Sequence, residues 1–275
     1  MLKDLIVNLA VAGKDDPTAD YALSVAQIFG AHLTGAAFAF KPVIPTMLIE
    51  VGTNVIDAAI NESVKAAKAA IDRFEVLTKK QGVVSDAIGI TETLVDAVER
   101  FARIARCYDL AIVAQADPDQ PGEQDLYIES ALFASGRPVL IVPYIQKSPA
   151  KFDRIVCCWD GSEPAARAIA DAMPFLHKAK KVDLLMITTA KTRGLRIAGT
   201  DMAQHLARHG LNVEIQQIKG ADSDIASVVL SYVADNSTDF LVMGGYGHSR
   251  WRELVLGGAT RGILSSMTVP TLMSH

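Results

Sequence analysis

Short apolar runs alternate with longer helical patterns along the whole chain. The apolar runs have the length of strands, and they are nearly continuous instead of alternating with polar residues. Between them, stretches such as 55–80 repeat apolar positions at helical spacing and are rich in Ala, Lys and Glu. Strands of this kind are buried on both faces, which predicts a parallel sheet covered by helices on both sides.

The same order of elements occurs twice, which predicts two tandem domains at 1–146 and 151–275, each of them doubly wound. The segments 108–113 and 238–243 also resemble each other in their letters, and a short polar seam at 146–151 separates the halves. The predicted strands of the first half are 5–9, 33–38, 83–84, 110–113 and 139–142. Those of the second half are 155–159, 182–187, 212–215, 240–243 and 269–273, with helices near 163–177, 199–209, 222–236 and 258–267.

Composition narrows the class of protein. The chain has 275 residues, of which 50% are hydrophobic and 21% are charged, with a net charge of -4, and this suits two packed domains. The acidic balance argues against nucleic acid as a partner. We expect no membrane span, because no run of about 18 apolar residues occurs, and no secretory leader. Three cysteines, two of them adjacent, suit a reducing cytoplasm.

A glycine-rich loop in the second half carries the clearest chemistry. Gly244, Gly245 and Gly247 follow the strand 240–243, and Gly257 and Gly258 come after nine intervening residues and open a helix. Glycines let bare backbone approach a ligand closely. Successive N–H groups and a helix N-terminus form an anion site at the carboxyl edge of a parallel sheet. His248 and Ser249 add donors beside it, although the pattern is not that of a Walker loop.

Asp160 lies at the end of the first strand of the second half, and we expect it on the same rim as the glycine loop. Its carboxylate can accept hydrogen bonds from ribose hydroxyls or from an adenine amine. The alternative is that Asp160 or Ser162 caps the helix 163–177, with Pro164 in the first turn. Both roles are compatible, since Ser162 can cap the helix while Asp160 faces the cleft.

These motifs resemble the universal stress proteins, in the tandem form with two such domains in one chain. The family signature, Gly-x-x-Gly, nine residues, Gly and a small residue, matches Gly244, Gly247, Gly257 and Gly258. The resemblance implies a five-stranded parallel sheet in each half, of the adenine nucleotide alpha hydrolase-like class. It also implies ATP or a related adenine nucleotide in the second half, with or without Mg²⁺.

The same resemblance implies roles for individual residues. Asp160 would meet the adenosine, Ile187 would lie near the base and Met243 would form the cleft floor. The backbone of the four signature glycines and of Ala259 would hold ribose and phosphates. Gly258 stands where the family usually has Ser or Thr, which removes one hydrogen bond of about 1 kcal/mol and predicts weaker binding. Thr260 and Ser249 are candidates to compensate.

The first half lacks these features. Val11 is expected where Asp160 would align, and 114–117 replaces the first two glycines with Ala-Gln-Ala-Asp. Acidic residues follow at 117–125 and would repel phosphates. We therefore expect no nucleotide in this half, which would instead serve as a packing partner or a sensing surface.

The predicted function is that of a cytoplasmic, regulatory stress-response protein, not an enzyme. One alternative is a nucleotide-independent scaffold or small-ligand binder that uses the apolar segment 41–53. A slow ATPase is the second alternative, although no catalytic triad or metal motif stands out. His205 and His209 have a metal-ligand spacing, but surface histidines are the simpler interpretation. The sequence leaves two arrangements open: the last strands of the two domains could pair within the chain, or they could pair between chains in a homo-oligomer such as a dimer.

Overall fold

The structure is a computed structural model that describes residues 1–13, 15–42, 53–117, 122–188, 199–220, 225–245 and 258–275. The chain divides into two compact units. Unit 1 contains Met1–Ala114 and Gly122–Arg137, and unit 2 contains Pro138–Gln146 and Ala150–His275 together with Gln115. Both are α/β units whose sheets are mostly parallel and flanked by helices, which confirms the predicted fold class.

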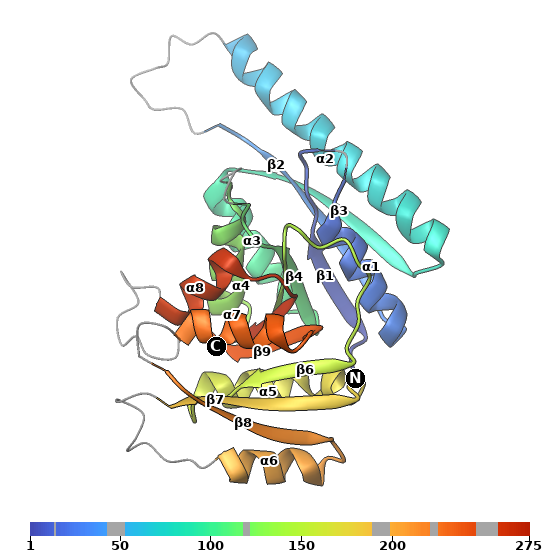
Figure 1. The fold of residues 1–275 in the computed structure, drawn as a ribbon. Helices are drawn as coiled ribbons and strands as arrows, with labels where there is room; N and C mark the ends of the chain where they lie inside the picture. The colour runs from blue at the N-terminus through green and yellow to red at the C-terminus, as the bar shows by residue number, and fades with distance from the viewer. Residues whose placement is uncertain (14, 43–52, 118–121, 189–198, 221–224, 246–257) are drawn as a thin grey trace. The chain divides into compact units, whose positions relative to one another are not determined.

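Unit 1 is a parallel sheet with the strand order β3-β2-β1-β4 among its described residues. Figure 1 shows α1 and α2 on one side of these strands and α3 and α4 on the other. The rings of Phe38, Phe101 and Tyr127 pack together in the core, with 5.7 Å between the last two centroids. The elements are β1 (Asp4–Asn8), α1 (Pro17–Phe29), β2 (His32–Phe40), α2 (Thr53–Gln81), β3 (Ser85–Glu92), α3 (Leu94–Ala105), β4 (Leu110–Ala114) and α4 (Gln124–Ala134).

The third strand differs from its prediction. The apolar pair Val83 and Val84 precedes β3 and does not form it, and the side chain of Val84 is 74% exposed. Gly82, at φ 67°, ends the preceding helix. Because β3 is an edge strand of unit 1 and is half-exposed, it lacks the continuous apolar run that marks a central strand.

Unit 2 has the strand order β5-β10-β9-β6-β7-β8, and its strands pair in parallel except for β5 with β10. Helix α5 packs on β9 and β10, α6 packs on β7 and β8, and α7 packs against α8. The rings of Phe175 and Phe240 stack at 4.9 Å in its core. The elements are β5 (Val139–Val142), β6 (Arg154–Cys158), α5 (Glu163–Leu176), β7 (Lys181–Thr188), α6 (Gly199–Arg208), β8 (Val213–Lys219), α7 (Ile225–Asp235), β9 (Phe240–Gly244), α8 (Gly258–Ser266) and β10 (Thr271–Ser274).

Strand β5 comes from the first half of the sequence but belongs to unit 2. It runs antiparallel to β10, with Ile141 opposite Thr271 and Val139 opposite Met273. The two last strands of the sequence repeat therefore pair within the chain, which was one of the two arrangements left open. The boundary of the repeat itself, at 146–151, stays a prediction.

Candidate functional site

The turn between β6 and α5 places Asp160 on the surface of unit 2. Its Oδ1 accepts a hydrogen bond from the Ser162 N–H at 2.9 Å, and Gly161 between them has φ 82°, a value that glycine adopts without strain. Ser162 is the N-cap of α5, where its Oγ accepts from the Ala165 N–H at 3.3 Å. Ser162 is therefore the cap, and the exposed Asp160 braces the turn through one carboxylate oxygen.

Three of the predicted site residues lie at the same edge of the sheet as Asp160. Strands β6, β7 and β9 are parallel, so their carboxyl ends lie side by side. Ile187 is half-buried near the end of β7, and Met243 (8% exposed) and Gly244 end β9. This is the edge at which open α/β sheets bind ligands.

Gly244 has a packing reason of its own. A Cβ at this position would lie 2.6 Å from the backbone nitrogen of Ala165 and 2.7 Å from the carbonyl carbon of Pro164. Since both atoms belong to the first turn of α5, no small shift relieves the overlap. Only glycine lets the end of β9 approach α5 this closely.

Helix α8 begins at this edge and carries further predicted site residues. It connects the parallel strands β9 and β10 and therefore runs opposite to them, with its N-terminus at their carboxyl ends. Gly258 is exposed at the start of α8, and a Cβ there would meet no atom of the described residues within 4 Å. Ala259 is half-buried, and Thr260 is 4% exposed.

The rest of the predicted site lies outside the described residues. This holds for four of the predicted nucleotide-binding residues: Gly247, His248, Ser249 and Gly257. It also holds for most of the apolar segment 41–53 and for 118–121 of the acidic loop. Their predicted roles stay predictions.

Trp159 is a residue at this edge that the sequence reasoning did not select. It follows β6 directly, its main-chain N–H donates to the Leu185 carbonyl at 2.9 Å, and its side chain is 5% exposed. Its indole Nε1 is buried without a hydrogen-bond partner in the structure described. Indole N–H groups normally find an acceptor when buried. The sequence offered one signal for this residue: a tryptophan, whose side chain carries a polar N–H, stands directly before Asp160.

The strand register corrects one alignment in the first half. Leu9 N–H donates to the Ala36 carbonyl as Trp159 N–H donates to that of Leu185, so Ala10 occupies the place of Asp160. The sequence alone had suggested Val11 as the equivalent of Asp160. The chain between the strand and the next helix differs between the two halves, and only the pairing fixes the correspondence. Neither Ala10 nor Val11 carries a carboxylate.

Unit 1 has an acidic cavity of about 170 Å³ where α1 approaches α2, and Leu9, Asp15, Asp16, Asp20 and Arg73 are among its lining residues. Burial raises the pKa of Asp16, against the lowering effect of hydrogen bonds from Ala19 and Ala10, and burial also raises the pKa of Asp20. Carboxylates in this setting disfavour a phosphate.

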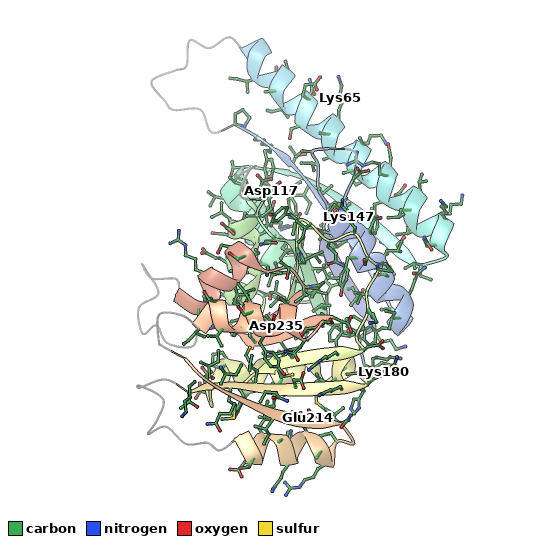
Figure 2. All side chains as sticks on the ribbon, in the orientation of Figure 1. Lys65, Asp117, Lys147, Lys180, Glu214 and Asp235 are labelled. Atoms are coloured by element: carbon green, nitrogen blue, oxygen red, sulfur yellow. The ribbon has the colours of Figure 1, made fainter. Side chains whose placement is uncertain are left out.

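The charges at the opposite, amino edge of the unit 2 sheet are paired. Arg154 contacts the fully buried Asp183 at 2.7 Å, and Lys181 contacts Glu214 at 2.6 Å. Lys180 contacts Asp153 at 3.1 Å, and Figure 2 labels Lys180 and Glu214 at this end of the unit. Lys180 and Lys181 of the basic run at 178–181 are thus engaged in ion pairs.

Other candidate groups do not gather into a further site. The rings of His205 and His209 lie 4.8 Å apart, yet the described residues contain no group of three or more His, Cys, Asp or Glu side chains that could hold a metal ion. Burial raises the pKa of Cys158 to about 12 and raises that of Cys157 as well. Among the described helices, none is long and apolar enough to cross a membrane.

Comparison with known proteins assigns the second half of the chain to a family. Residues 151–275 match the model of the universal stress protein family. The second half of the chain belongs to the universal stress protein family. A universal stress protein from Synechocystis sp. is 27% identical over 176 residues, which cover 56% of this chain and 59% of that relative. The match thus spans less than two thirds of the relative's length.

Solved structures also resemble this chain over nearly its full length. A universal stress protein from Archaeoglobus fulgidus is similar over 98% of this chain and 96% of its own, with a TM-score of 0.63 at 14% identity. A functionally unknown protein from Pseudomonas aeruginosa is similar over 99% of this chain and 92% of its own, with a TM-score of 0.66 at 12% identity. At such identities the likeness shows the fold alone.

Proposed function

We propose that unit 2 binds ATP or a related adenine nucleotide and that the protein acts as a regulatory stress-response protein in the cytoplasm. The observation that carries the proposal is the common edge of β6, β7, β9 and α8. This edge combines the exposed carboxylate of Asp160 with the helix N-terminus at Gly258. Adenosine needs acceptors for its hydroxyls and amine, and phosphates need N–H donors.

The described residues fit an adenine nucleotide in three respects. The first N–H groups of α8 have no partners within the helix and carry the positive end of its dipole. No atom of the described residues fills the space beside Gly258. The indole Nε1 of Trp159, after the end of β6, is a buried donor with no partner among the described residues, and a ring nitrogen or a hydroxyl of the ligand would satisfy it. Asp160 would orient the adenosine, and the first turn of α8 would neutralise the phosphates.

A regulatory output follows if ligand-bound and free proteins differ in conformation or assembly, because a ligand shifts a population only by its differential affinity.

The direct test of nucleotide binding is equilibrium binding of labelled ATP, with and without Mg²⁺. We expect saturable binding that Asp160→Ala weakens. Asp235→Ala is the matched control, since Asp235 is exposed at the end of α7 and away from the carboxyl edge. No binding at millimolar ATP would reject the proposal.

The open space at Gly258 gives a sharper prediction. Gly258→Ser restores the hydroxyl of the family pattern without a clash, and one added hydrogen bond of about 1 kcal/mol should tighten ATP binding about fivefold. Gly258→Ala fills the same space without a donor and is the control. If Ser and Ala at this position give equal affinity, phosphates do not approach Gly258.

The same assays separate the two alternatives. A nucleotide-independent scaffold melts at the same temperature with and without ATP, whereas a bound nucleotide raises the melting temperature. A slow ATPase releases phosphate in proportion to enzyme concentration, and Asp160→Ala abolishes that release.

A further inference from the structure

Gln115 follows β4 directly and stands where the other half has a glycine. Its main-chain N–H donates to the carbonyl of Val142 at 2.8 Å, and that of Gly245 donates to the carbonyl of Ser274 at 2.9 Å. Val142 and Ser274 are the last residues of β5 and β10. The pairing therefore shows that Gln115 and Gly245 are equivalent positions, one with a long amide side chain and one with none.

The Gln115 side chain is buried, at 2% exposure, and both ends of its amide are bonded. Nε2 donates to the carbonyl of Leu264 at 2.8 Å, and Oε1 accepts from the Tyr144 N–H at 3.4 Å. All three residues belong to unit 2. The bond to Leu264 joins residues 149 positions apart in the sequence.

Leu264 is in the last turn of α8, whose final carbonyls have no partner within the helix. The Gln115 amide gives one of them a buried donor and so acts as a cap from a distant part of the chain. A helix of 9 residues is too short to be stable by itself and depends on such tertiary contacts. The opposite end of the same helix carries Gly258.

We propose that Gln115 is a positioning residue for the nucleotide site, which it controls by anchoring α8. This inference rests on the proposed function, because the site it serves is the one described above. The first half has no glycines directly after β4. Gln115, which stands in their place, fixes α8, the helix whose N–H groups would meet the phosphates in unit 2. Nucleotide affinity is thereby set in part by the segment that follows β4.

The test compares two full-length variants that each lose a glutamine amide at the end of a helix. Gln115→Met keeps the length of the side chain and removes both hydrogen bonds. Gln27→Met is the matched control, because Gln27 Nε2 donates to the carbonyl of Gln81, the last residue of α2 in unit 1, at 3.3 Å. Labelled-ATP affinity and amide hydrogen exchange of residues 258–267 are measured for each.

We expect Gln115→Met to weaken ATP binding about three- to tenfold, the value of one or two lost hydrogen bonds, and to speed exchange in α8. Gln27→Met should leave both unchanged. Gln115→Glu retains the acceptor, loses the donor and should weaken binding at least as much. It also serves as the second variant if Gln115→Met does not fold.

Unchanged ATP affinity in Gln115→Met and Gln115→Glu overturns the inference, as does unchanged exchange in α8. Equal losses of affinity in Gln115→Met and Gln27→Met also overturn it, because the effect would then be one of general stability. If the unaltered protein binds no ATP, the proposed function fails first. Exchange in α8 then still decides whether Gln115 anchors the helix.

Discussion

At the scale of single residues, the two halves agree at one edge of their sheets and differ at the other. Asp109 Oδ2 accepts the Asp4 N–H at 3.1 Å in unit 1, and Asp239 Oδ2 accepts the Arg154 N–H at 2.9 Å in unit 2. These aspartates tie the start of each first strand to its neighbour. The carboxyl edge has diverged instead, since Ala10 stands in the place of Asp160. The shared edge maintains the fold, and the divergent edge is where the proposed function lies.

Asp16 gives a prediction about pH at this scale. Its pKa is raised by burial in the folded state, so its protonated form stabilises the fold fully at low pH. That contribution is lost as pH rises through the folded pKa. Asn at this position keeps a capping oxygen and stays neutral. Asp16→Asn should therefore gain in stability relative to the unaltered protein as pH rises from 3 to 7.

The measurement is urea unfolding of both proteins across that pH range. The Asp96→Asn variant is the control, since Asp96 is an exposed residue in the first turn of α3. A stability difference that is constant with pH would show that burial does not disfavour the Asp16 carboxylate.

At the scale of elements, the glycines of the proposed phosphate loop have different physical reasons. Gly244 is fixed by the contact of β9 with the first turn of α5, whereas a Cβ at Gly258 would meet no atom of the described residues within 4 Å. The sequence presents both as one motif. Packing thus requires glycine at position 244 with or without a ligand. Packing among the described residues gives no such reason for Gly258, and ligand binding would supply one.

Gly244→Ala should lower the free energy of unfolding by about 1–3 kcal/mol, because overpacking against backbone atoms cannot be relieved by a rotamer change. Gly258→Ala, its matched control, should change stability by less than about 0.5 kcal/mol. Chemical denaturation of the two variants measures this directly. Equal free energies of unfolding for the two variants would mean that β9 and α5 can move apart with little loss of stability.

At the scale of the whole molecule, the compact units do not coincide with the two copies of the repeat. Strand β5 lies in the first copy by sequence and in unit 2 by structure, where its Leu140 is opposite Leu272. Both leucines are fully buried. Residues of the first copy therefore help to form the core of unit 2.

Leu140→Ala should destabilise unit 2 by about 2–5 kcal/mol, the usual effect of truncating a buried leucine. Hydrogen exchange should rise in β10 and β9 before it rises in β1 or β2. Ile128→Ala, a fully buried position of α4 in unit 1, is the matched control and should give the reverse order. The same order for both variants would contradict the assignment of β5 to unit 2.

The sequence by itself determined the alternation of strands and helices, and it predicted the duplication and the glycine-rich loop after β9. Each of these depends on neighbouring residues. Hydrophobic spacing marks a buried strand or an amphipathic helix. A capping serine such as Ser162 marks the start of a helix, and a glycine marks its end. The exception was β3, where an exposed edge strand leaves little apolar pattern to recognise.

Only the tertiary structure decided which positions of the two halves correspond and which distant residues meet. Strand pairing showed that Ala10, not Val11, is the structural equivalent of Asp160. The contacts of β5 assign this strand to unit 2. Packing buried the indole N–H of Trp159 with no partner among the described residues, and it brought Gln115 to Leu264. Such contacts depend on how sheets and helices meet in space, and residues far apart in sequence leave no local pattern that announces their contact.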